Sequence, residues 1–401
     1  MRPADSPWFF ACAGFLALGC VERAEVLSPG SGTVENDGGA TPSTVSSVEL
    51  GDAHGCAVVS SRLHCWGNND SGELGLGDAT ARNSPTLVEG RWVEVAAGVR
   101  HTCARDDLGR VACFGANERG QLGTGDRDAR DVPVFVSLPS PAALVATDFA
   151  HTCAVLTDAT LYCWGKNEEG ELGQDDPWPG DQSPDADALT PVAVPGTWRS
   201  VDTGQGHTCA VRLDGTLWCW GRNSDHELGE SDMIQIRFPV QVGTDADWLA
   251  VEAGQHHTCG VREDRFAYCW GRNTGAEDGE GAPLGIAGAS ELSTPTRLDG
   301  AGDVALLRSD TFHTCTADRV ARLSCWGRNA EGQLGLGDQV LRETPVLVGS
   351  GYRAVAVGRF QTCGVAENGW LECAGKNDTG QLGTGDDTDR WTFSPVTFPP
   401  P

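Results

Sequence analysis

The sequence lacks the features that mark several classes of protein. It has no basic run, two methionines, few lysines and no long helix-forming segment. The formal net charge of −27 excludes a nucleic-acid partner, because the phosphate backbone would be repelled and no basic stretch offsets the repulsion. The chain also contains no G-x-S-x-G elbow, no H-E-x-x-H, no C-x-x-C and no P-loop. We therefore expect no enzyme, no bound metal and no cofactor.

The residues that are abundant favour short strands and turns. The 401 residues include 53 glycines and 21 prolines, a composition typical of many strands joined by many turns. The length allows two or three ordinary domains or one large β domain. The acidic balance by itself indicates solubility more than any particular partner.

Residues 1 to 20 resemble an export signal. An apolar run from Trp8 to Leu18 is too short to span a bilayer and ends in small residues. The end of this segment resembles the lipobox of bacterial lipoproteins, in which the cysteine is acylated, so Cys20 is the predicted lipidation site. The alternatives are soluble secretion and retention in the cytoplasm.

Residues 21 to 44 contain no aromatic residue and are rich in Gly, Ser, Thr, Pro and Glu. Such a segment cannot bury enough apolar surface to offset the entropy of ordering, so we predict a flexible linker. It would join the lipid anchor to one domain over residues 45 to 401. The membrane is then a partner only through the N-terminal lipid.

The spacing of the cysteines indicates the architecture. Two of the sixteen, Cys12 and Cys20, lie in the signal region, and the other fourteen form seven pairs that recur every 47 to 56 residues. The two members of a pair are nine residues apart in the first pair and ten in the others. The pairs are Cys56–Cys65, Cys103–Cys113, Cys153–Cys163, Cys209–Cys219, Cys259–Cys269, Cys315–Cys325 and Cys363–Cys373.

Each pair is predicted to form one disulfide across an antiparallel hairpin. Opposed side chains of such a hairpin lie about 4.5–5.5 Å apart at Cβ, and a non-hydrogen-bonded pair approaches the distance that a disulfide requires. Seven local bridges need an oxidising compartment, which agrees with export. The alternatives are free thiols in a reducing compartment and a metal site, although the spacing of zinc-binding cysteines is absent.

The segments around each pair repeat as well. A short strand ends in Gly, a His-Thr-Cys strand and a Cys-Trp-Gly strand follow, and a Gly-rich loop leads to a Pro-x-x-Val segment. That pattern predicts about four strands per unit in seven units. Gly recurs two residues and Asn four residues after the second cysteine, and we interpret both as turn residues.

A histidine stands two residues before the first cysteine in six units, and Gln361 replaces it in the seventh. Six equivalent histidines could form a ring of metal ligands, but residues on separate units need not converge. We interpret them as packing and hydrogen-bonding groups inside each unit. The six are His54, His101, His151, His207, His257 and His313.

The pattern H-T-C-A-V…D-G-x-L-x-C-W-G-x-N-x-x-G-x-L-G-x-G resembles the repeat of the regulator of chromosome condensation family, over residues 45 to 399. The resemblance implies an all-β fold, a seven-bladed β-propeller with four-stranded blades, which hides strand edges by radial repetition. The cysteine pairs resemble those of exported bacterial members. Phe114 and Ala374 depart from the Trp of the family pattern, and His226 replaces a turn Gly.

This resemblance leaves the function open. The founding member is a guanine-nucleotide exchange factor for a nuclear small GTPase and binds chromatin, whereas a secreted bacterial member inhibits β-lactamases with its loop face. An exported, acidic chain without a basic tail would not meet the first set of partners, and fold alone does not determine function. An enzyme would show two titratable groups with shifted pKa values converging at one end of the channel.

We look for function where the repeats differ, because repeats build the frame and insertions build sites. The longest insertion, Gln174 to Thr190, holds Trp178 between two prolines, and tryptophan is enriched in binding hot spots. Its carboxylates do not match the spacing of a Ca²⁺-binding EF-hand loop. A second insertion, Thr274 to Ser290, is rich in Gly and Ala. The candidate partner-binding residues are Asp175, Asp176, Trp178, Asp181, Asp185 and Asp187.

The sequence therefore predicts a non-enzymatic propeller outside the cytoplasm, either an envelope lipoprotein or a secreted protein. We expect a monomer that binds a protein or a glycan through its loop face. The alternatives are a guanine-nucleotide exchange factor and a secreted inhibitor of an extracellular enzyme.

Overall fold

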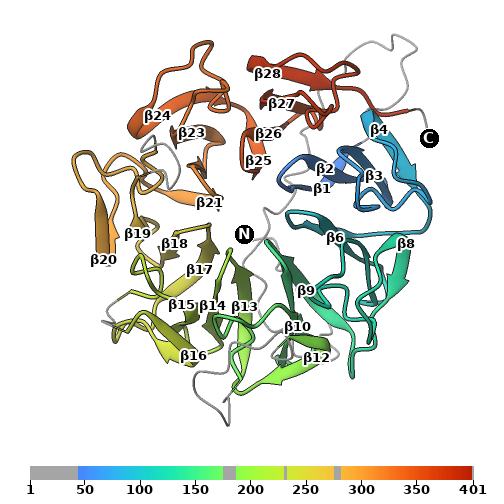
Figure 1. Cartoon of the computed structure of the whole chain (residues 1–401). Coiled ribbons are helices and arrows are strands. Elements are labelled where there is room, and N and C mark those ends of the chain that lie inside the picture. The colour runs from blue at the N-terminus through green and yellow to red at the C-terminus, as the bar shows by residue number, and fades with distance from the viewer. Residues whose placement is uncertain (1–43, 175–186, 230–232, 275–280, 400–401) are drawn as a thin grey trace, which may run out of the picture.

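The computed structural model describes residues 44–174, 187–229, 233–274 and 281–399. Its strands form seven four-stranded antiparallel sheets, each made of four consecutive strands. Figure 1 shows these sheets arranged as blades around a central axis. The predicted all-β, seven-bladed propeller is confirmed. Within the described ranges, no helix has the length and hydrophobicity needed to cross a bilayer.

We number the blades 1 to 7 in chain order. The strands of blades 1 to 3 are β1 (Val45–Leu50), β2 (His54–Val59), β3 (Arg62–Gly67), β4 (Arg82–Val88), β5 (Glu94–Ala97), β6 (His101–Arg105), β7 (Val111–Gly115), β8 (Arg130–Phe135), β9 (Ala142–Thr147), β10 (His151–Leu156), β11 (Leu161–Gly165) and β12 (Ala188–Val194). The strands of blades 4 to 7 are β13 (Trp198–Thr203), β14 (His207–Arg212), β15 (Leu217–Arg222), β16 (Gln235–Gln241), β17 (Trp248–Ala253), β18 (His257–Arg262), β19 (Ala267–Arg272), β20 (Glu291–Arg297), β21 (Val304–Ser309), β22 (His313–Asp318), β23 (Arg322–Gly327), β24 (Arg342–Ser350), β25 (Tyr352–Val357), β26 (Gln361–Ala366), β27 (Leu371–Gly375) and β28 (Arg390–Val396).

The first strand of each blade is the innermost one. Strands β1, β5, β9, β13, β17, β21 and β25 contact their neighbours in a closed series and enclose a central channel. One end of the ring carries the short turns between first and second strands and the long loops between third and fourth strands. We call this end the loop face. The opposite end carries the hairpin turns between second and third strands.

The cysteine pairs lie opposite each other on the second and third strands of every blade. Cys153 faces Cys163 in register, and the other six pairs are placed in the same way. All seven form disulfides with their Cα atoms 4.1 Å apart, a close spacing in keeping with a non-hydrogen-bonded pair. The predicted pairing, one bridge per blade, is confirmed.

A bulge follows each second cysteine and begins the loop. In blade 3 the register shifts between Cys163 and Gly165, whose φ is 102°, and a Cβ there would lie 2.5 Å from the Ala150 carbonyl oxygen. Only glycine fits this position. The Oδ1 of Asn167 accepts a hydrogen bond from the Leu172 backbone N–H at 3.0 Å, and all seven repeats make the equivalent bond. Both residues are turn residues, as predicted.

The hydrophobic core lies between adjacent blades. Trp164 of blade 3 is fully buried against Leu122 and Val136 of blade 2. Its indole N–H donates to the Gln121 carbonyl of the blade 2 loop at 2.9 Å. The tryptophan therefore fills the interface and satisfies a buried loop carbonyl with one side chain.

The two blades without this tryptophan fill the space differently. Phe114 takes its place in blade 2 and lies against Gly75 of blade 1. In blade 7, Ala374 is too small to fill this space. Phe393 of the outer strand β28 fills it instead and lies against Gly335 of blade 6. The volume is kept although the residue that supplies it moves to another strand.

The histidines before the first cysteine bond between blades, so the prediction that they bond inside each blade is wrong. His207 Nε2 lies 2.9 Å from Thr258 Oγ1 of blade 5, and that hydroxyl donates to the Glu227 carbonyl of blade 4 at 2.8 Å. His257 contacts Ser309 Oγ of blade 6 at 2.6 Å. Equivalent histidine–threonine contacts join His54 to Thr102, His101 to Thr152, His151 to Thr208 and His313 to Thr362.

Gln361 closes this series between blades 7 and 1. Blade 1 has Gly55 where the other six blades have threonine, so a histidine in blade 7 would find no hydroxyl. Gln361 Nε2 donates instead to the Gly51 carbonyl of blade 1 at 2.8 Å. The indole N–H of Trp66 donates to the Gln381 carbonyl at 2.9 Å across the same seam. Figure 1 shows these first and last blades side by side, and each takes all its strands from its own end of the chain.

Removing one bridge tests the contribution of the disulfides. The double variant Cys209→Ala, Cys219→Ala should lose about 2–3 kcal/mol of unfolding free energy, because the bridge closes a short loop in the unfolded chain. Urea unfolding followed by tryptophan fluorescence measures the loss. Mass spectrometry after alkylation of the native wild type is the control, and fourteen free thiols there would contradict the pairing.

Removing one hydroxyl tests the bonds between blades. Thr258→Val keeps the shape of the side chain but leaves His207 Nε2 without its partner, and it removes one of the two hydrogen bonds to the Glu227 carbonyl. A buried polar group without a partner costs about 1–3 kcal/mol, so the Tm should fall by several degrees in calorimetry. Thr296→Val on β20 is the matched control, because its hydroxyl bonds only the nearby Thr294 carbonyl. A Thr258→Val variant as stable as this control would contradict the role.

Candidate functional site at the channel mouth and loop face

A cavity opens where the central channel meets the loop face. Residues that connect the first and second strands of all seven blades line it, and its volume is about 60 Å³. Ligand pockets of enzymes and receptors usually measure about 300–1,000 Å³, so this cavity suits a small chemical group. Its polar residues are Asp52, Asp148, Gln205, Gln255, Asp310, Thr311 and Arg359.

Four charged residues hold equivalent positions further along the inner strands, opposite the first cysteine of their blades. They are Glu49, Asp202, Glu252 and Arg308, whereas blades 2, 3 and 7 have alanine there. Arg308 Nη1 lies 2.8 Å from Glu252 Oε1, and Nη2 lies 3.9 Å from Glu49 Oε1. Asp202 Oδ2 accepts a hydrogen bond from the Ala253 N–H at 2.6 Å.

Burial raises the pKa values of four carboxyl groups in this region. Burial, opposed by the Ala253 N–H and by Arg308, raises the pKa of Asp202 to about 7. It raises the pKa of Asp310 to about 6, and that of Glu252 well above its usual value although Arg308 opposes the change. Burial raises the pKa of Asp148 well above its usual value too, and the charge of Asp310 adds to the rise.

Asp148 and Asp310 stand where the other five blades have glycine. In blade 2, a Cβ on Gly98 would lie 2.1 Å from the Asp148 carbonyl oxygen, so the backbones of adjacent blades approach closely here. Blades 3 and 6 place a carboxylate at this crowded ring. Neither residue is among the predicted site residues, although the change from Gly to Asp three residues before the histidine is visible in the sequence.

The long loops of the loop face fall into two groups. In blade 1, Asn69 Nδ2 donates to the Asp78 carbonyl at 2.8 Å, and Asp78 Oδ2 lies 2.7 Å from Arg82 Nη2. Blades 2, 6 and 7 have the same Asn–Asp–Arg arrangement, which we call the loop staple. Its ion pairs there are Asp126–Arg130, Asp338–Arg342 and Asp386–Arg390. The Asp-x-x-x-Arg pair is missing from the sequences of the loops in blades 3, 4 and 5. We call these three loops the divergent half of the loop face.

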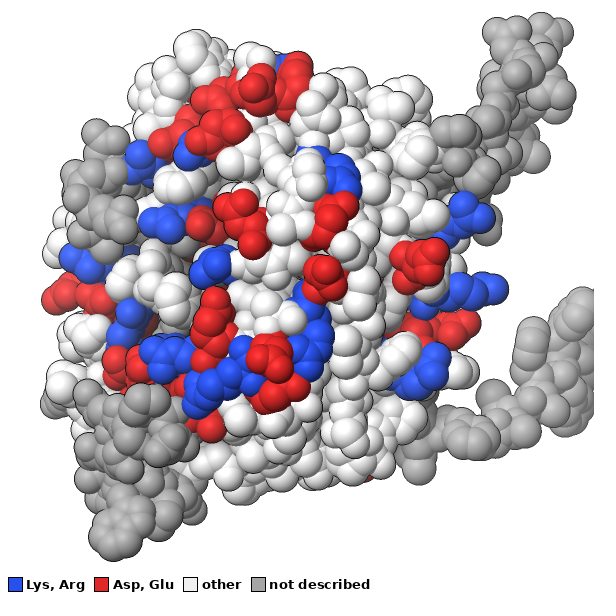
Figure 2. Space-filling view, turned by 45° about the vertical axis from the view of Figure 1, so that its right-hand side comes forward, with Lys and Arg blue, Asp and Glu red and all other residues white. Residues whose placement is uncertain are grey.

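Charges of both signs are mixed on the side of the molecule that Figure 2 presents. Figure 2 shows Lys and Arg beside Asp and Glu on the side that it presents, without a broad field of one sign. Most of the pairs have short contacts, such as Arg119 with Glu168 at 2.7 Å and Arg262 with Asp247 at 2.7 Å. The excess negative charge of the chain therefore does not form one uniform patch on this side.

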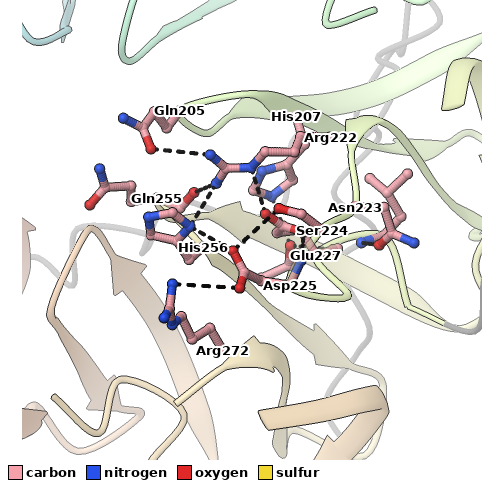
Figure 3. A network of polar contacts seen from close by, with 12 residues as sticks. Gln205, His207, Arg222, Asn223, Ser224, Asp225, Glu227, Gln255, His256 and Arg272 are labelled. Carbon is pink, nitrogen blue, oxygen red and sulfur yellow. Dashed lines mark hydrogen bonds and ion pairs between the residues drawn. The ribbon is translucent and has the colours of Figure 1, made fainter. Parts of the chain in front are cut away.

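A polar network joins blades 4 and 5 beside the cavity (Figure 3). Arg222 donates through Nε to Glu227 Oε1 at 2.7 Å and through Nη1 to Gln205 Oε1 at 3.3 Å. His256 Nδ1 lies 2.9 Å from Arg222 Nη2 and 2.9 Å from Asp225 Oδ2. The hydrogen bond with His256 holds the pKa of the Asp225 carboxyl below its usual value although burial opposes this. The network fixes the Gln205 side of the cavity wall.

Three residues of this network have the geometry of metal ligands. One ligand atom each of Asp225, Glu227 and His256 lie within 4.8 Å of one another. The guanidinium of Arg222 already contacts two of the three, and Arg272 Nη1 lies 3.6 Å from Asp225 Oδ1. Two cations therefore occupy the place that a metal ion would need, and the residues present do not fit one.

The predicted partner-binding loop is only partly within the described residues. Asp175, Asp176, Trp178, Asp181 and Asp185 lie outside them, as do Cys20 and the rest of residues 1–43.

Asp187 is described, and its environment corrects the prediction made for it. Its side chain is fully buried, 2.9 Å from Arg127 Nη1 and 3.5 Å from Arg119 Nη1 of blade 2. It also accepts a hydrogen bond from the Asn167 N–H at 3.3 Å. Asp187 is therefore a scaffold residue that joins blades 2 and 3.

The channel has one feature that we expect of an enzyme. Carboxyl groups with shifted pKa values converge at one end of it. A nucleophile beside them would complete the argument for catalysis. The hydroxyl of Thr311 lines the cavity, but it bonds the Asp310 carboxylate at 3.0 Å. The arrangement supports binding of a positive group more directly than a chemical step.

The raised pKa values predict that stability falls as pH rises. The folded state holds protons on these carboxyls between about pH 4, where unfolded carboxyls titrate, and about pH 7, where Asp202 titrates. The stability that these protons contribute is fully present below about pH 4 and is lost as the pH rises to about 7. The staple aspartates, whose pKa values are lowered, titrate below the window and do not obscure it.

Asp148→Asn should therefore raise the Tm by a few degrees at pH 8 and leave it nearly unchanged at pH 4.5. Calorimetry across this range measures the effect. Asp107→Asn, at an exposed hairpin turn on the opposite end of the ring, is the matched control and should be neutral at both pH values. A pH-independent gain for Asp148→Asn would contradict the assignment.

Comparison with known proteins agrees with this architecture. The family model of the regulator of chromosome condensation (RCC1) repeat matches residues 60–105, 109–155, 158–211, 214–261 and 322–365, and a second model of the same repeat matches 92–121 and 198–227. Together these segments cover more than half of the chain.

Solved structures with low sequence identity share the fold. Human WBSCR16 is 19% identical with a TM-score of 0.74, over 84% of this chain and 94% of that one. Prp20p from Saccharomyces cerevisiae is 19% identical with a TM-score of 0.71, over 88% of each chain. The ectodomain of the Arabidopsis thaliana receptor kinase ACR4 is 16% identical with a TM-score of 0.51, over 87% and 98%. By its repeats and its seven-bladed ring, the chain belongs to the regulator of chromosome condensation (RCC1) repeat family.

Proposed function

We propose that this propeller is a non-enzymatic, monomeric binding module that works outside the reducing cytoplasm. Its partner is a protein or a glycan, and the binding surface is the divergent half of the loop face. Export begins with residues 1 to 20, and Cys20 is the site of acylation.

The observation that carries the proposal is the uneven distribution of the loop staple. Four blades repeat one Asn–Asp–Arg arrangement, whereas blades 3, 4 and 5 lack it and carry both insertions. Blade 4 also exposes Met233 and Ile234, the latter to 76%. Exposed apolar residues next to variable loops are typical of interaction surfaces on a rigid scaffold.

The disulfides support a location outside the reducing cytoplasm. Seven bridges within hairpins, all with buried sulfurs, are expected of an exported protein and not of one kept reduced by the cytosol. The receptor ectodomain that shares the fold shows that such a propeller is used outside the cell.

Membership of the family favours a second candidate, a guanine-nucleotide exchange factor. The yeast relative Prp20p has been studied for its binding to Gsp1p and histones. Both candidates are binding functions on the same scaffold, and they differ in the compartment that they need. An oxidised chain with seven bridges would not share a compartment with a cytosolic GTPase.

Affinity capture from the envelope and extracellular fractions of the source organism tests the proposal. The oxidised wild type is compared with Trp178→Ala and with a deletion of residues 175 to 186, which spares the buried Asp187. We expect one partner to be enriched by the wild type at least tenfold over the deletion variant. Trp370→Ala is the matched control, because it removes an exposed tryptophan from the opposite end of the ring.

Two outcomes count against the proposal. Unchanged capture by Trp178→Ala and the deletion variant would reject this loop as the binding site. Accelerated release of a fluorescent GDP analogue from a small GTPase, by chain with its bridges intact, would favour the exchange factor.

A further inference from the structure

We propose that the cavity at the channel mouth binds an alkylammonium group, supplied by a small free amine or by the lysine side chain of a partner. Asp52, Asp148 and Asp310 would hold the charge, and Phe149 would cover the adjoining methylene groups. This is a second site, distinct from the divergent half of the loop face, and its test does not depend on the test of those loops.

Carboxyl groups outnumber guanidinium groups around this cavity. Six carboxyl groups line the cavity or the channel directly beneath it, namely Asp52, Asp148, Asp310, Glu49, Asp202 and Glu252, against the two guanidinium groups of Arg308 and Arg359. Arg308 pairs with Glu252 at 2.8 Å, and Arg359 lies 3.6 Å from Asp52. The two guanidinium groups cannot neutralise all six carboxyl groups when these are ionised, so a further positive group can take the place of the protons that the raised pKa values hold there.

Asp148 is the carboxyl group that this surplus leaves without a partner. It makes no hydrogen bond and no ion pair with any residue that the structure describes, and it lines the cavity. Burial is the main cause of its raised pKa. Asp310 accepts hydrogen bonds from the Thr311 N–H at 2.6 Å and the Thr311 hydroxyl at 3.0 Å, which leaves acceptor capacity on its carboxylate. A half-buried carboxylate without a partner is costly unless a cation or a proton meets it.

Phe149 is a second, independent feature that points to an organic cation. It lines the cavity beside Asp148 and is 38% exposed, although an apolar ring of this size is normally buried. Its equivalents in the other blades are Asp52, Val99, Gln205, Gln255, Thr311 and Arg359, so no other blade has an aromatic ring there. A phenyl face beside carboxylates attracts ammonium groups through the ring quadrupole.

The size and composition of the cavity favour an ammonium group over a divalent metal ion. A volume of about 60 Å³ admits the end of a chain but not a whole metabolite. Ca²⁺ takes six to eight oxygen ligands, whereas part of this wall consists of Phe149, Val99 and the Arg359 cation. An alkylammonium needs only a few acceptors for its three N–H donors and an apolar surface for its stem.

Binding should be linked to pH and to salt. The ammonium group favours the ionised carboxylates, so protons are released when it binds, and affinity should rise several-fold from pH 6 to pH 8. Affinity should also fall when sodium chloride is raised from 20 mM to 200 mM, because salt screens the attraction.

Isothermal titration calorimetry of the oxidised full-length chain with 1,5-diaminopentane at pH 8 tests the proposal. Asp148→Asn should weaken binding about tenfold or more, because it removes a charge-assisted contact without changing the shape of the side chain. Phe149→Ala should weaken it a few-fold. Asp107→Asn, which changes the net charge equally at the opposite end of the ring, should bind like the wild type. Circular dichroism and the Tm confirm that each variant is folded.

The comparison of ligands separates the sources and the alternatives. Binding of both 1,5-diaminopentane and Nα-acetyl-lysine methylamide supports the alkylammonium site, and binding of the lysine compound alone identifies a partner side chain as the source. No heat with either compound would overturn the proposal. So would binding of CaCl₂ or MgCl₂ in their place, or an equal loss of affinity in Asp107→Asn and Asp148→Asn.

Discussion

The propeller depends on one carbonyl acceptor that six of the seven loops present to the following blade. In blade 4 the Glu227 carbonyl accepts from the Thr258 hydroxyl at 2.8 Å and from the Trp270 indole at 2.8 Å, both in blade 5. The threonine in turn contacts His207. Hydrogen bonds between buried polar groups are costly to lose, so this part of these six loops is fixed by the packing of two blades. Variation is free only in the outer part of each loop, where blades 3 to 5 differ from the rest.

The inner ring imposes a second constraint, because adjacent blades bring their backbones together around a narrow channel. Glycine meets this constraint in five blades, and a Cβ on Gly98 would collide with the next carbonyl at 2.1 Å. Asp148 and Asp310 break the rule in blades 3 and 6. Natural repeats keep glycine where space demands it, so a charged replacement at such a position points to a role in the channel beyond packing.

The two candidate surfaces use charge in opposite ways. On the outer surface, ion pairs such as Asp78–Arg82 are exposed and contribute little to stability, but they shape the loops. In the channel, carboxyls such as Asp202 and Glu252 are half-buried and oppose one another, which lowers stability as they ionise. The disulfides offset part of this cost within each hairpin. A frame stabilised in this way can carry an acidic channel and irregular loops together.

The sequence by itself determined the features that depend on local register. Cysteines such as Cys153 and Cys163 face each other because a short hairpin allows one pairing, and Gly165 is required by its own φ and by the turn beside it. From these positions the seven blades, their disulfides and the family could be predicted. Only the tertiary structure decided which residues meet across blades, because the placement of blades around an axis is not encoded in local spacing. It joined His207 to Thr258, buried Asp187 under two arginines of blade 2, and brought Asp148 and Asp310 from distant parts of the chain to one channel mouth.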